Sequence, residues 1–207
     1  MATGATFWNL MAKRYSMSPI ADQESYEKKL AITRKYLDQQ SEVMEFGCGT
    51  GSTALLHAPW VKSLLAIDYS SKMIDIANEK KRREGITNVR FEVGDIDSME
   101  LEPEQFDAIL GLNILHLLPA WEQVLEKVYA LLKPGGHFIS SSGCLQGRLR
   151  LMRGIFATLG VFGGLPKIAA FSEDEFLARH ASIGFTLVER LEQPGAPFLF
   201  LVAGKPD

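Results

Sequence analysis

The chain has 207 residues, of which 46% are apolar and 23% charged, and its formal net charge is −3. These fractions are typical of a globular domain and exclude a disordered chain. The longest uncharged runs, Ala108–Trp121 and Gly154–Pro166, are shorter than the ~18 apolar residues that a membrane-spanning helix needs. The first residues lack the pattern of a signal peptide. We therefore expect one soluble domain, 1–207, with no stable membrane insertion.

The cysteines and the net charge indicate the cellular compartment and the kind of partner. The two cysteines, Cys48 and Cys144, form no CxxC pair, and no histidine cluster has metal-ligand spacing. This pattern predicts a cytoplasmic protein without a metal. Because nucleic-acid binding depends on accumulated Lys and Arg, the slight acidity argues against nucleic acid as the partner.

Hydrophobic patterning alternates between strands and helices along the middle of the chain. The expected strands are Val43–Phe46, Val61–Ile67, Val89–Val93, Phe106–Leu112 and His137–Ser142. The expected helices are Thr53–His57, Lys72–Glu84 and Trp121–Leu132. Gly85 and the pair Gly135–Gly136 stand where C-cap glycines are expected for the last two helices. Strands separated by helices predict a parallel sheet with right-handed crossovers.

Both ends of the chain depart from this alternation. Ser25–Gln39 has an amphipathic helical pattern and follows the aromatic segment Phe7–Tyr15. Near the other end, Ser172 and Glu175 form a capping box for a helix that runs to about Ile183. The last two expected strands are Phe185–Leu191 and Pro197–Ala203. A hairpin of these two strands predicts an antiparallel edge.

The first strand runs directly into a glycine-rich loop, Gly47-Cys48-Gly49-Thr50-Gly51, and then a helix. Glycines let the backbone turn tightly and approach a ligand with no Cβ in the way. The amides at the start of the helix favour an anionic or strongly polar group. The loop predicts a site for a dinucleotide or another adenosine compound, and a plain glycine-rich turn is the alternative.

Two acids follow at the ends of later strands. Asp68 lies 21 residues after Gly47, where a carboxylate accepts the hydroxyls of an adenosine ribose, and a helix N-cap is the alternative. Tyr69 is placed to pack beside the ribose or adenine. Asp95 is expected to accept from the adenine amino group while Ile96 covers the ring, and a turn aspartate is the alternative.

Glu45 interrupts the first strand, which is otherwise apolar. A buried carboxylate is unfavourable unless it is paired or hydrogen-bonded. It would repel a pyrophosphate and attract a ligand that carries an ammonium and a sulfonium. Glu45 therefore favours S-adenosylmethionine over a nicotinamide dinucleotide.

These ordered motifs resemble those of the class I S-adenosylmethionine-dependent methyltransferases of the small-molecule type (methyltransferase domain 11/25-like). The matching segments are Val43–Gly51, Leu65–Ser70, Gly94–Ile96, Phe106–Leu110 and Leu132–Gly136. The resemblance covers about residues 25–142 and implies an α/β, Rossmann-like fold. The implied sheet has seven strands in the order 3-2-1-4-5-7-6, with strand 7 antiparallel and helices on both faces.

The resemblance also implies roles for particular residues. Glu45, Gly47 and Gly49 would line the methionine part of the cofactor, Asp68 the ribose, and Asp95 with Ile96 the adenine. Asn113 would lie near the reacting methyl group. The whole expected cofactor-binding set is Glu45, Gly47, Cys48, Gly49, Gly51, Asp68, Tyr69, Met73, Asp95, Ile96 and Asn113. Cys48 is expected to pack in the loop and not to act as a nucleophile.

The acceptor is expected to be a small apolar or aromatic molecule, methylated by in-line displacement. His116 follows the fourth strand and is the candidate general base, with a structural histidine as the alternative. Tyr15 is a second catalytic candidate. The expected segments are an N-terminal cap (1–24), the cofactor-binding core (25–142), a lid or acceptor insertion (145–171), and a terminal helix and hairpin (172–207). The insertion could instead be an amphipathic surface for membranes or partners.

Three other functions remain open on the sequence. Asn113-Ile114-Leu115-His116 lacks the Asp/Asn-Pro-Pro-aromatic motif of nucleic-acid amino methyltransferases. An NAD-dependent oxidoreductase would share the glycine loop and the ribose acid, but Glu45 argues against it. A non-catalytic S-adenosylmethionine-binding module would share the whole cofactor site.

Overall fold

A computed structural model describes residues 2–144, 169, 171–191 and 198–207. These residues contain a seven-stranded sheet in the order β3-β2-β1-β4-β5-β7-β6. The strands are β1 (Glu42–Phe46), β2 (Ser63–Asp68), β3 (Val89–Val93), β4 (Phe106–Leu112), β5 (Leu132–Gly143), β6 (Thr186–Leu191) and β7 (Phe198–Gly204). Strands β1 to β5 pair in parallel, and β7 is antiparallel to both of its neighbours. The strand order and the antiparallel β7 predicted from the sequence are confirmed.

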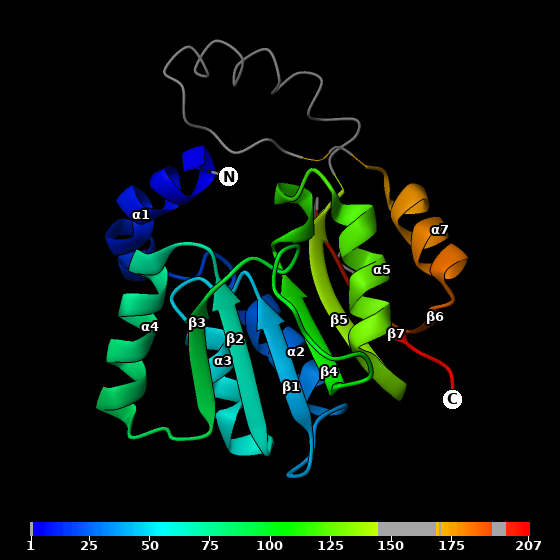
Figure 1. Cartoon of the computed structure of the whole chain (residues 1–207), viewed down its shortest axis with the longest axis horizontal. Coiled ribbons are helices and arrows are strands. Elements are labelled where there is room, and N and C mark those ends of the chain that lie inside the picture. The colour runs from blue at the N-terminus through cyan, green and yellow to red at the C-terminus, as the bar shows by residue number, and fades with distance from the viewer. Residues whose placement is uncertain (1, 145–168, 170, 192–197) are drawn as a thin grey trace.

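Helices cover both faces of the sheet (Figure 1). They are α1 (Ala2–Met17), α2 (Gln23–Arg34), α3 (Ser52–His57), α4 (Ser71–Glu84), α5 (Trp121–Leu131) and α7 (Glu173–Ile183), with 3-10 turns at Ala58–Trp60 and Leu115–Leu117. Within the described ranges, no helix is both long and apolar enough to cross a bilayer.

The core is divided by the sheet into two apolar clusters. Alternate residues of β5 point to opposite faces, so Phe138 joins the cluster under α5 and α7 while Ile139 joins the cluster under α2, α3 and α4. Almost every residue of β1, β2 and β4 is buried. Strands covered on both faces read as continuous apolar runs, which is why the sequence predicted them well.

The sequence placed some element boundaries wrongly. The helix expected over Ser25–Gln39 ends at Arg34, because Asp38 accepts bonds from the Ser41 hydroxyl and the Gln40 amide and so forms a tight turn before β1. The aromatic segment at the N-terminus, for which no helix was expected, lies within α1.

The sequence predicted that Gly135 and Gly136 cap α5, and this prediction was wrong. The helix ends at Leu131, and Leu132 has extended backbone that begins β5. The Gly135 amide donates to the Lys205 carbonyl, and the Lys205 amide donates to the Gly136 carbonyl. Pairing with Lys205, the residue directly after β7, therefore continues this strand through both glycines, while Gly85 does cap α4 with left-handed backbone.

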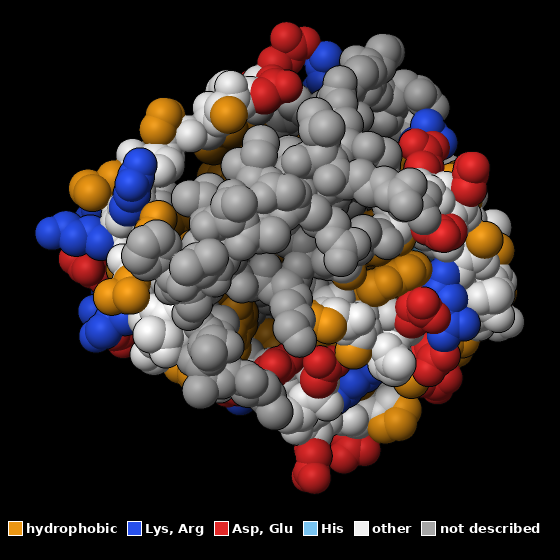
Figure 2. Space-filling model, turned by 90° about the horizontal axis from the view of Figure 1, so that it is seen from above, with side chains coloured by type: hydrophobic (Ala, Val, Ile, Leu, Met, Phe, Trp, Pro, Cys, Tyr) orange, Lys and Arg blue, Asp and Glu red, His pale blue; other side chains and the backbone are white. Residues whose placement is uncertain are grey.

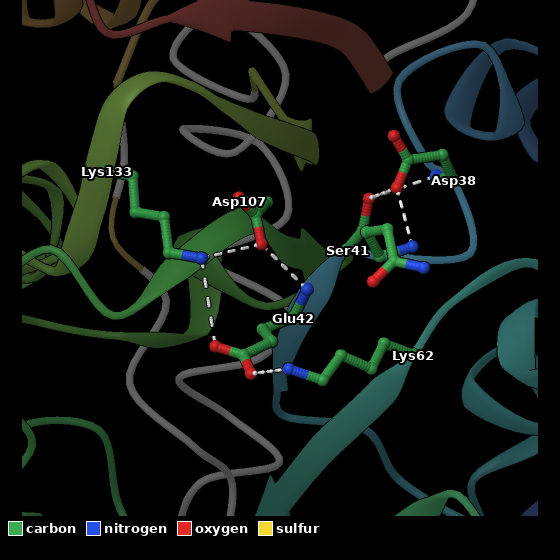
Figure 3. A network of polar contacts seen from close by, with 7 residues as sticks. Asp38, Ser41, Glu42, Lys62, Asp107 and Lys133 are labelled. Atoms are coloured by element: carbon green, nitrogen blue, oxygen red, sulfur yellow. Dashed lines mark hydrogen bonds and ion pairs between the residues drawn. The ribbon is translucent and has the colours of Figure 1, made fainter.

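A polar network holds the amino ends of the central strands together (Figure 3). The Asp107 carboxylate on β4 accepts from the Glu42 amide at 2.8 Å and from Lys133 Nζ at 2.9 Å. Lys62 Nζ lies 2.7 Å from the Glu42 carboxylate. These contacts join β1, β2, β4 and β5 at the edge of the sheet opposite the glycine loop.

Candidate functional site

The glycine loop connects β1 to α3 at the carboxyl edge of the sheet. Strand β1 lies between β2 and β4 in the sheet. The chain continues to β2 on one side and later to β4 on the other, so the loop lies at a topological switch point, where α/β sheets bind ligands. Gly47 has φ +65°, and a Cβ there would lie 2.5 Å from the Ile114 side chain. At Gly51, φ is +73° and a Cβ would lie 2.5 Å from the Phe91 ring. Backbone conformation and packing therefore both require glycine at these two positions.

Glu45 lies one residue before the end of β1 and is 3% exposed. Burial raises its pKa to about 8, and the charge of Asp68 adds to this shift. Its Oε2 has no hydrogen-bond partner among the described residues. A buried carboxylate oxygen without a partner is unfavourable, so this position fits a bound cation such as an ammonium group.

Asp68 closes β2 and holds the glycine loop. Its Oδ2 accepts from the Gly49 amide and its Oδ1 from the Ser70 amide, both at 2.9 Å. Burial raises the pKa of Asp68, and these two amide bonds oppose the rise. The N-cap of α4 is Ser70, whose hydroxyl accepts from the Met73 amide. The alternative interpretation of Asp68 as the N-cap is therefore wrong.

The residues expected near the adenine are partly buried. Ile96 is buried, whereas Asp95 is half-buried and its Oδ1 accepts from the Asp97 amide at 3.2 Å. That bond is typical of a turn aspartate. A turn aspartate can also contact the adenine, so the two interpretations of Asp95 are compatible. Met73 is buried in the first turn of α4.

Helix α1 packs against the start of α4, beside this site. The Trp8 indole lies beside Tyr69. Burial, followed by the charges of Asp68 and Asp95, raises the pKa of Tyr69 to about 12, and Trp8 slightly opposes this rise. The Asn9 side-chain Oδ1 accepts from the Ser70 hydroxyl at 2.7 Å and from the Lys72 amide at 3.1 Å. These contacts attach the N-terminal segment to the β2–α4 junction.

The charge of the Glu45 carboxylate acts on two tyrosines, Tyr15 and Tyr26. A Cβ at Gly49 would lie 3.6 Å from the Tyr15 ring, so this ring covers the middle of the glycine loop. The Tyr15 side chain is 52% exposed, and its partial burial, followed by the charges of Glu45 and Asp68, raises its pKa. Tyr26 shares a hydrogen bond of 3.1 Å with the Thr53 hydroxyl, and burial, together with the charge of Glu45, raises its pKa. The sequence analysis missed Tyr26, because its place in the helical pattern of α2 carries no functional signal.

Lys80 is another residue that the sequence analysis missed. Its ammonium donates to the Thr50 hydroxyl at 2.9 Å and to the Ser52 hydroxyl at 2.8 Å. Burial lowers the pKa of Lys80. Cys48, in the same loop, is buried, and burial with the charges of Glu45 and Asp68 raises the pKa of its thiol well above the usual value. A protonated thiol agrees with a packing role for Cys48.

Asn113 and His116 lie in the segment after β4. Asn113 has left-handed backbone (φ +57°), its amide donates to the Ser141 carbonyl at 2.7 Å, and its side-chain oxygen accepts from the Ser141 hydroxyl at 3.0 Å. His116 is buried, which lowers its pKa. Its Nδ1 accepts from the Gly143 amide at 3.4 Å, so a neutral ring in this contact carries its proton on Nε2.

This strand order, with a glycine loop after β1 and an acid at the end of β2, defines a Rossmann-like domain of the methyltransferase type. The model of the family described as "Methyltransferase domain" matches residues 37–169, which is more than half of the chain. The chain therefore belongs to this family of methyltransferase domains, as the motifs predicted.

The chain is similar in sequence to several proteins that are named as methyltransferases. The chain is 28% identical over 100 residues to the uncharacterized methyltransferase YcgJ of Bacillus subtilis, covering 48% of this chain and 40% of YcgJ. It is 26% identical over 116 residues to the ubiquinone biosynthesis O-methyltransferase of Coxiella burnetii, covering 54% and 49%. It is 29% identical over 113 residues to the malonyl-[acyl-carrier protein] O-methyltransferase of Priestia megaterium, covering 54% and 40%. The matches thus span less than half the length of each relative.

Solved structures share the fold over most of the chain. The crystal structure of YcgJ from Bacillus subtilis has a TM-score of 0.71 at 16% identity and covers 87% of this chain and 99% of that one. An S-adenosylmethionine-dependent methyltransferase from Mesorhizobium loti has a TM-score of 0.71 at 20% identity, covering 88% and 99%. The [4+2]-cyclase SpnF has a TM-score of 0.73 at 16% identity, covering 92% and 85%. At these identities the similarity shows the fold alone.

Proposed function

We propose that the protein transfers the methyl group of S-adenosylmethionine to a small apolar or aromatic acceptor by in-line displacement. The observation that carries this proposal is the buried Glu45 carboxylate, whose Oε2 has no hydrogen-bond partner among the described residues, directly before the glycine loop. An ammonium group would satisfy this oxygen, whereas the pyrophosphate of a dinucleotide would be repelled by it.

The other proposed cofactor contacts lie at the same carboxyl edge of the sheet. Asp68 would accept from the ribose hydroxyls, and Asp95 with Ile96 would contact the adenine. The loop residues Gly47, Cys48, Gly49 and Gly51, together with Tyr69, Met73 and Asn113, would complete the cofactor-binding set. The bound cofactor supplies a methyl group on a sulfonium, which is already activated for displacement.

Catalysis by the chain would therefore rest on alignment and the exclusion of water. The Tyr15 ring covers Gly49 and would shield the methionine end of the site from solvent. If shielding is its role, Tyr15→Phe keeps the turnover rate and Tyr15→Ala lowers it. If the Tyr15 hydroxyl takes part in the chemistry, both variants lose turnover.

A general base is needed only for an acceptor whose proton must leave. The proposal assigns this role to His116, whose ring would have to take the proton on Nε2. The Gly143 contact favours the neutral tautomer that already carries a proton there, so acting as a base requires the other tautomer and the loss of this contact. An acceptor that binds already ionised would instead receive a hydrogen bond from Nε2–H.

The pH profile of turnover separates these two roles of His116. A base gives a rate that falls at low pH with the imidazole pKa, and His116→Ala then loses about 100-fold or more. A donor gives no such acid limb, and His116→Gln retains part of the rate. Full turnover by His116→Ala would contradict both roles.

Two measurements test the proposed function itself. Calorimetry with S-adenosylmethionine and with NAD separates a methyltransferase from an oxidoreductase, and we expect binding of the first ligand only. Transfer of label from methyl-tritiated cofactor to a metabolite extract separates an enzyme from a non-catalytic binding module. Because two relatives are named O-methyltransferases, acceptors with a hydroxyl or carboxyl group are the first to fractionate. Label on nucleic acid would contradict the proposed acceptor class.

The predicted insertion at 145–171 lies almost wholly outside the described residues, which include only Ala169 and Phe171 from it. Its role as a lid or as an interaction surface stays a prediction. The division into a cap (1–24), a core (25–142) and a terminal unit (172–207) likewise remains a proposal.

A further inference from the structure

The outer face of α1 carries the two most exposed large hydrophobic side chains of the described residues. Leu10 is 79% exposed and Met17 is 68% exposed. Residues 10, 13, 14 and 17 are spaced by three and four positions, so they share one face of the helix. Lys13 and Arg14 lie between Leu10 and Met17 and are also exposed. We call this set of four residues the α1 patch.

The charge of the α1 patch contrasts with that of the whole chain. The chain has a net charge of −3, but its first acidic residue is Asp22, so α1 is purely basic. None of the ion pairs found in the described ranges involves Lys13 or Arg14. In the view from above, the left edge, the side on which both α1 and α4 lie, carries hydrophobic and basic side chains with some acidic ones among them (Figure 2).

The opposite face of α1 belongs to the candidate site. Tyr15 covers Gly49, Trp8 contacts Tyr69, and Asn9 binds the start of α4. A helix with its side chains is about 10 Å across, so the α1 patch lies roughly that far from the glycine loop. A surface that binds the patch would therefore be held beside the cofactor site.

We propose that the α1 patch docks the protein on an anionic lipid surface. Apolar side chains next to Lys and Arg, on a helix too short to span a bilayer, are the features of an interfacial helix. The basic side chains complement anionic headgroups, and α1 itself contains no acidic residue that would oppose this attraction. If the proposed apolar acceptor is correct, docking also places the site where such a molecule partitions; this link alone rests on the proposed function.

The same arrangement disfavours a second copy of the chain as the occupant. In a twofold contact between two α1 patches, the same surface meets itself. Because Lys13 and Arg14 occupy the middle of the patch, four cations would then face one another. A lipid surface meets the patch with opposite charge and with apolar chains below it.

Flotation of the full chain with vesicles tests this proposal. The vesicles are phosphatidylcholine, either alone or with about one third phosphatidylserine as the anionic lipid. We expect binding to the anionic vesicles only, weakened by added salt. Lys13→Gln with Arg14→Gln should weaken binding by about thirty-fold, from the contribution of two cations near an anionic surface. Leu10→Ser with Met17→Ser should weaken it further, and both pairs should leave the melting temperature unchanged.

Matched controls come from exposed residues elsewhere. Leu187→Ser with Val188→Ser on β6 removes two exposed hydrophobic side chains, and Arg82→Gln with Arg83→Gln on α4 removes two neighbouring exposed cations. Both control pairs should bind vesicles like the unchanged chain. No binding to anionic vesicles, or equal losses in the controls, would overturn the proposal.

Two further outcomes would show that something other than a lipid surface covers the α1 patch, and each would overturn the proposal. A dimer that dissociates in Leu10→Ser with Met17→Ser would assign the α1 patch to a second copy. A lower melting temperature of that variant would assign it to another part of this chain. Calorimetry with S-adenosylmethionine, done without vesicles, tests the cofactor site separately, because none of these substitutions touches it.

Discussion

The two ends of β1 each carry a glutamate, and the two side chains are in opposite situations. Glu42, at the amino end, is paired with Lys62 at 2.7 Å and with Lys133 at 3.7 Å, and its pKa is lowered, first by Lys62 (Figure 3). Glu45, at the carboxyl end, is buried, its Oε2 is unpaired among the described residues, and its pKa is raised to about 8. One strand thus has a closed polar network at one end and an unsatisfied carboxylate at the other.

This difference indicates that the Glu42 end of β1 stabilises the fold, whereas the Glu45 end is suited to a ligand. The network around Glu42 pairs every charge that it brings together and joins four strands. Around Glu45 the described residues leave the carboxylate without a cation, which disfavours the ligand-free state. An unfavourable buried group that folding does not compensate indicates a site whose partner is a ligand.

The largest expected effect is on stability at alkaline pH. A carboxyl whose pKa is raised from 4.5 to about 8 on folding disfavours the folded state increasingly as pH rises through that window, because the unfolded chain releases the proton first. Glu45→Gln removes this charge and should stabilise the ligand-free protein by about 4 kcal/mol at pH 8.5. Urea denaturation at pH 5, 7 and 8.5 measures the effect.

The comparison must be made between the variant and the unchanged chain at each pH. Burial lowers the pKa of His57 and of His180 to about 4 each, so both histidines favour folding above pH 6.5 and lose this contribution as pH falls towards 4. Their slope has the opposite sign to that of Glu45 and cancels in the difference. A difference that does not grow with pH would show that Glu45 is not a buried, raised-pKa carboxyl.

The next effect is on cofactor affinity. Glu45→Gln should weaken S-adenosylmethionine binding by about 100-fold, since a charge-assisted bond to the ammonium is lost. Calorimetry at pH 7.5 measures it. The matched control is Glu42→Gln on the same strand, which should leave the affinity unchanged and lower stability by about 0.5 kcal/mol, the usual value of an exposed ion pair. Equal losses of affinity in both variants would remove the proposed distinction between the two ends.

A smaller effect is expected at Asp68. An asparagine keeps one acceptor oxygen, so Asp68→Asn can hold only one of the Gly49 and Ser70 amides. We expect affinity for S-adenosylmethionine to fall about tenfold, together with a lower melting temperature. Asp75→Asn, an exposed acid of α4, is the control. Unchanged affinity in Asp68→Asn would exclude the ribose role.

The smallest effect is expected at Lys80. Lys80→Met removes the donors to Thr50 and Ser52 and should cost about 1 kcal/mol of stability, as measured by urea denaturation. Arg82→Met, which changes an exposed cation of the same helix, should have no measurable effect. Identical behaviour of the two variants would mean that Lys80 contributes no more to stability than an exposed cation of α4.

The sequence predicted most of the fold because its signals are local. Buried parallel strands have continuous apolar patterns, and glycines and short turns separate them from helices, so the five central strands were predicted from the residues themselves. The sheet order was implied by the family resemblance and is confirmed. Boundaries were wrong where distant pairing decides them, as when the bonds of Gly135 and Gly136 to Lys205, directly after β7, continue β5 through both glycines.

By itself, the sequence determined the family, because the glycine loop, Glu45 and Asp68 occupy positions that follow from strand and turn patterns. Only the tertiary structure decided which neighbours the site has: Tyr15 over Gly49, Lys80 at the loop, and the Gly143 amide at His116. These contacts join residues far apart in the chain. Spacing along a sequence encodes secondary structure, whereas such contacts exist only once helices and strands have packed together.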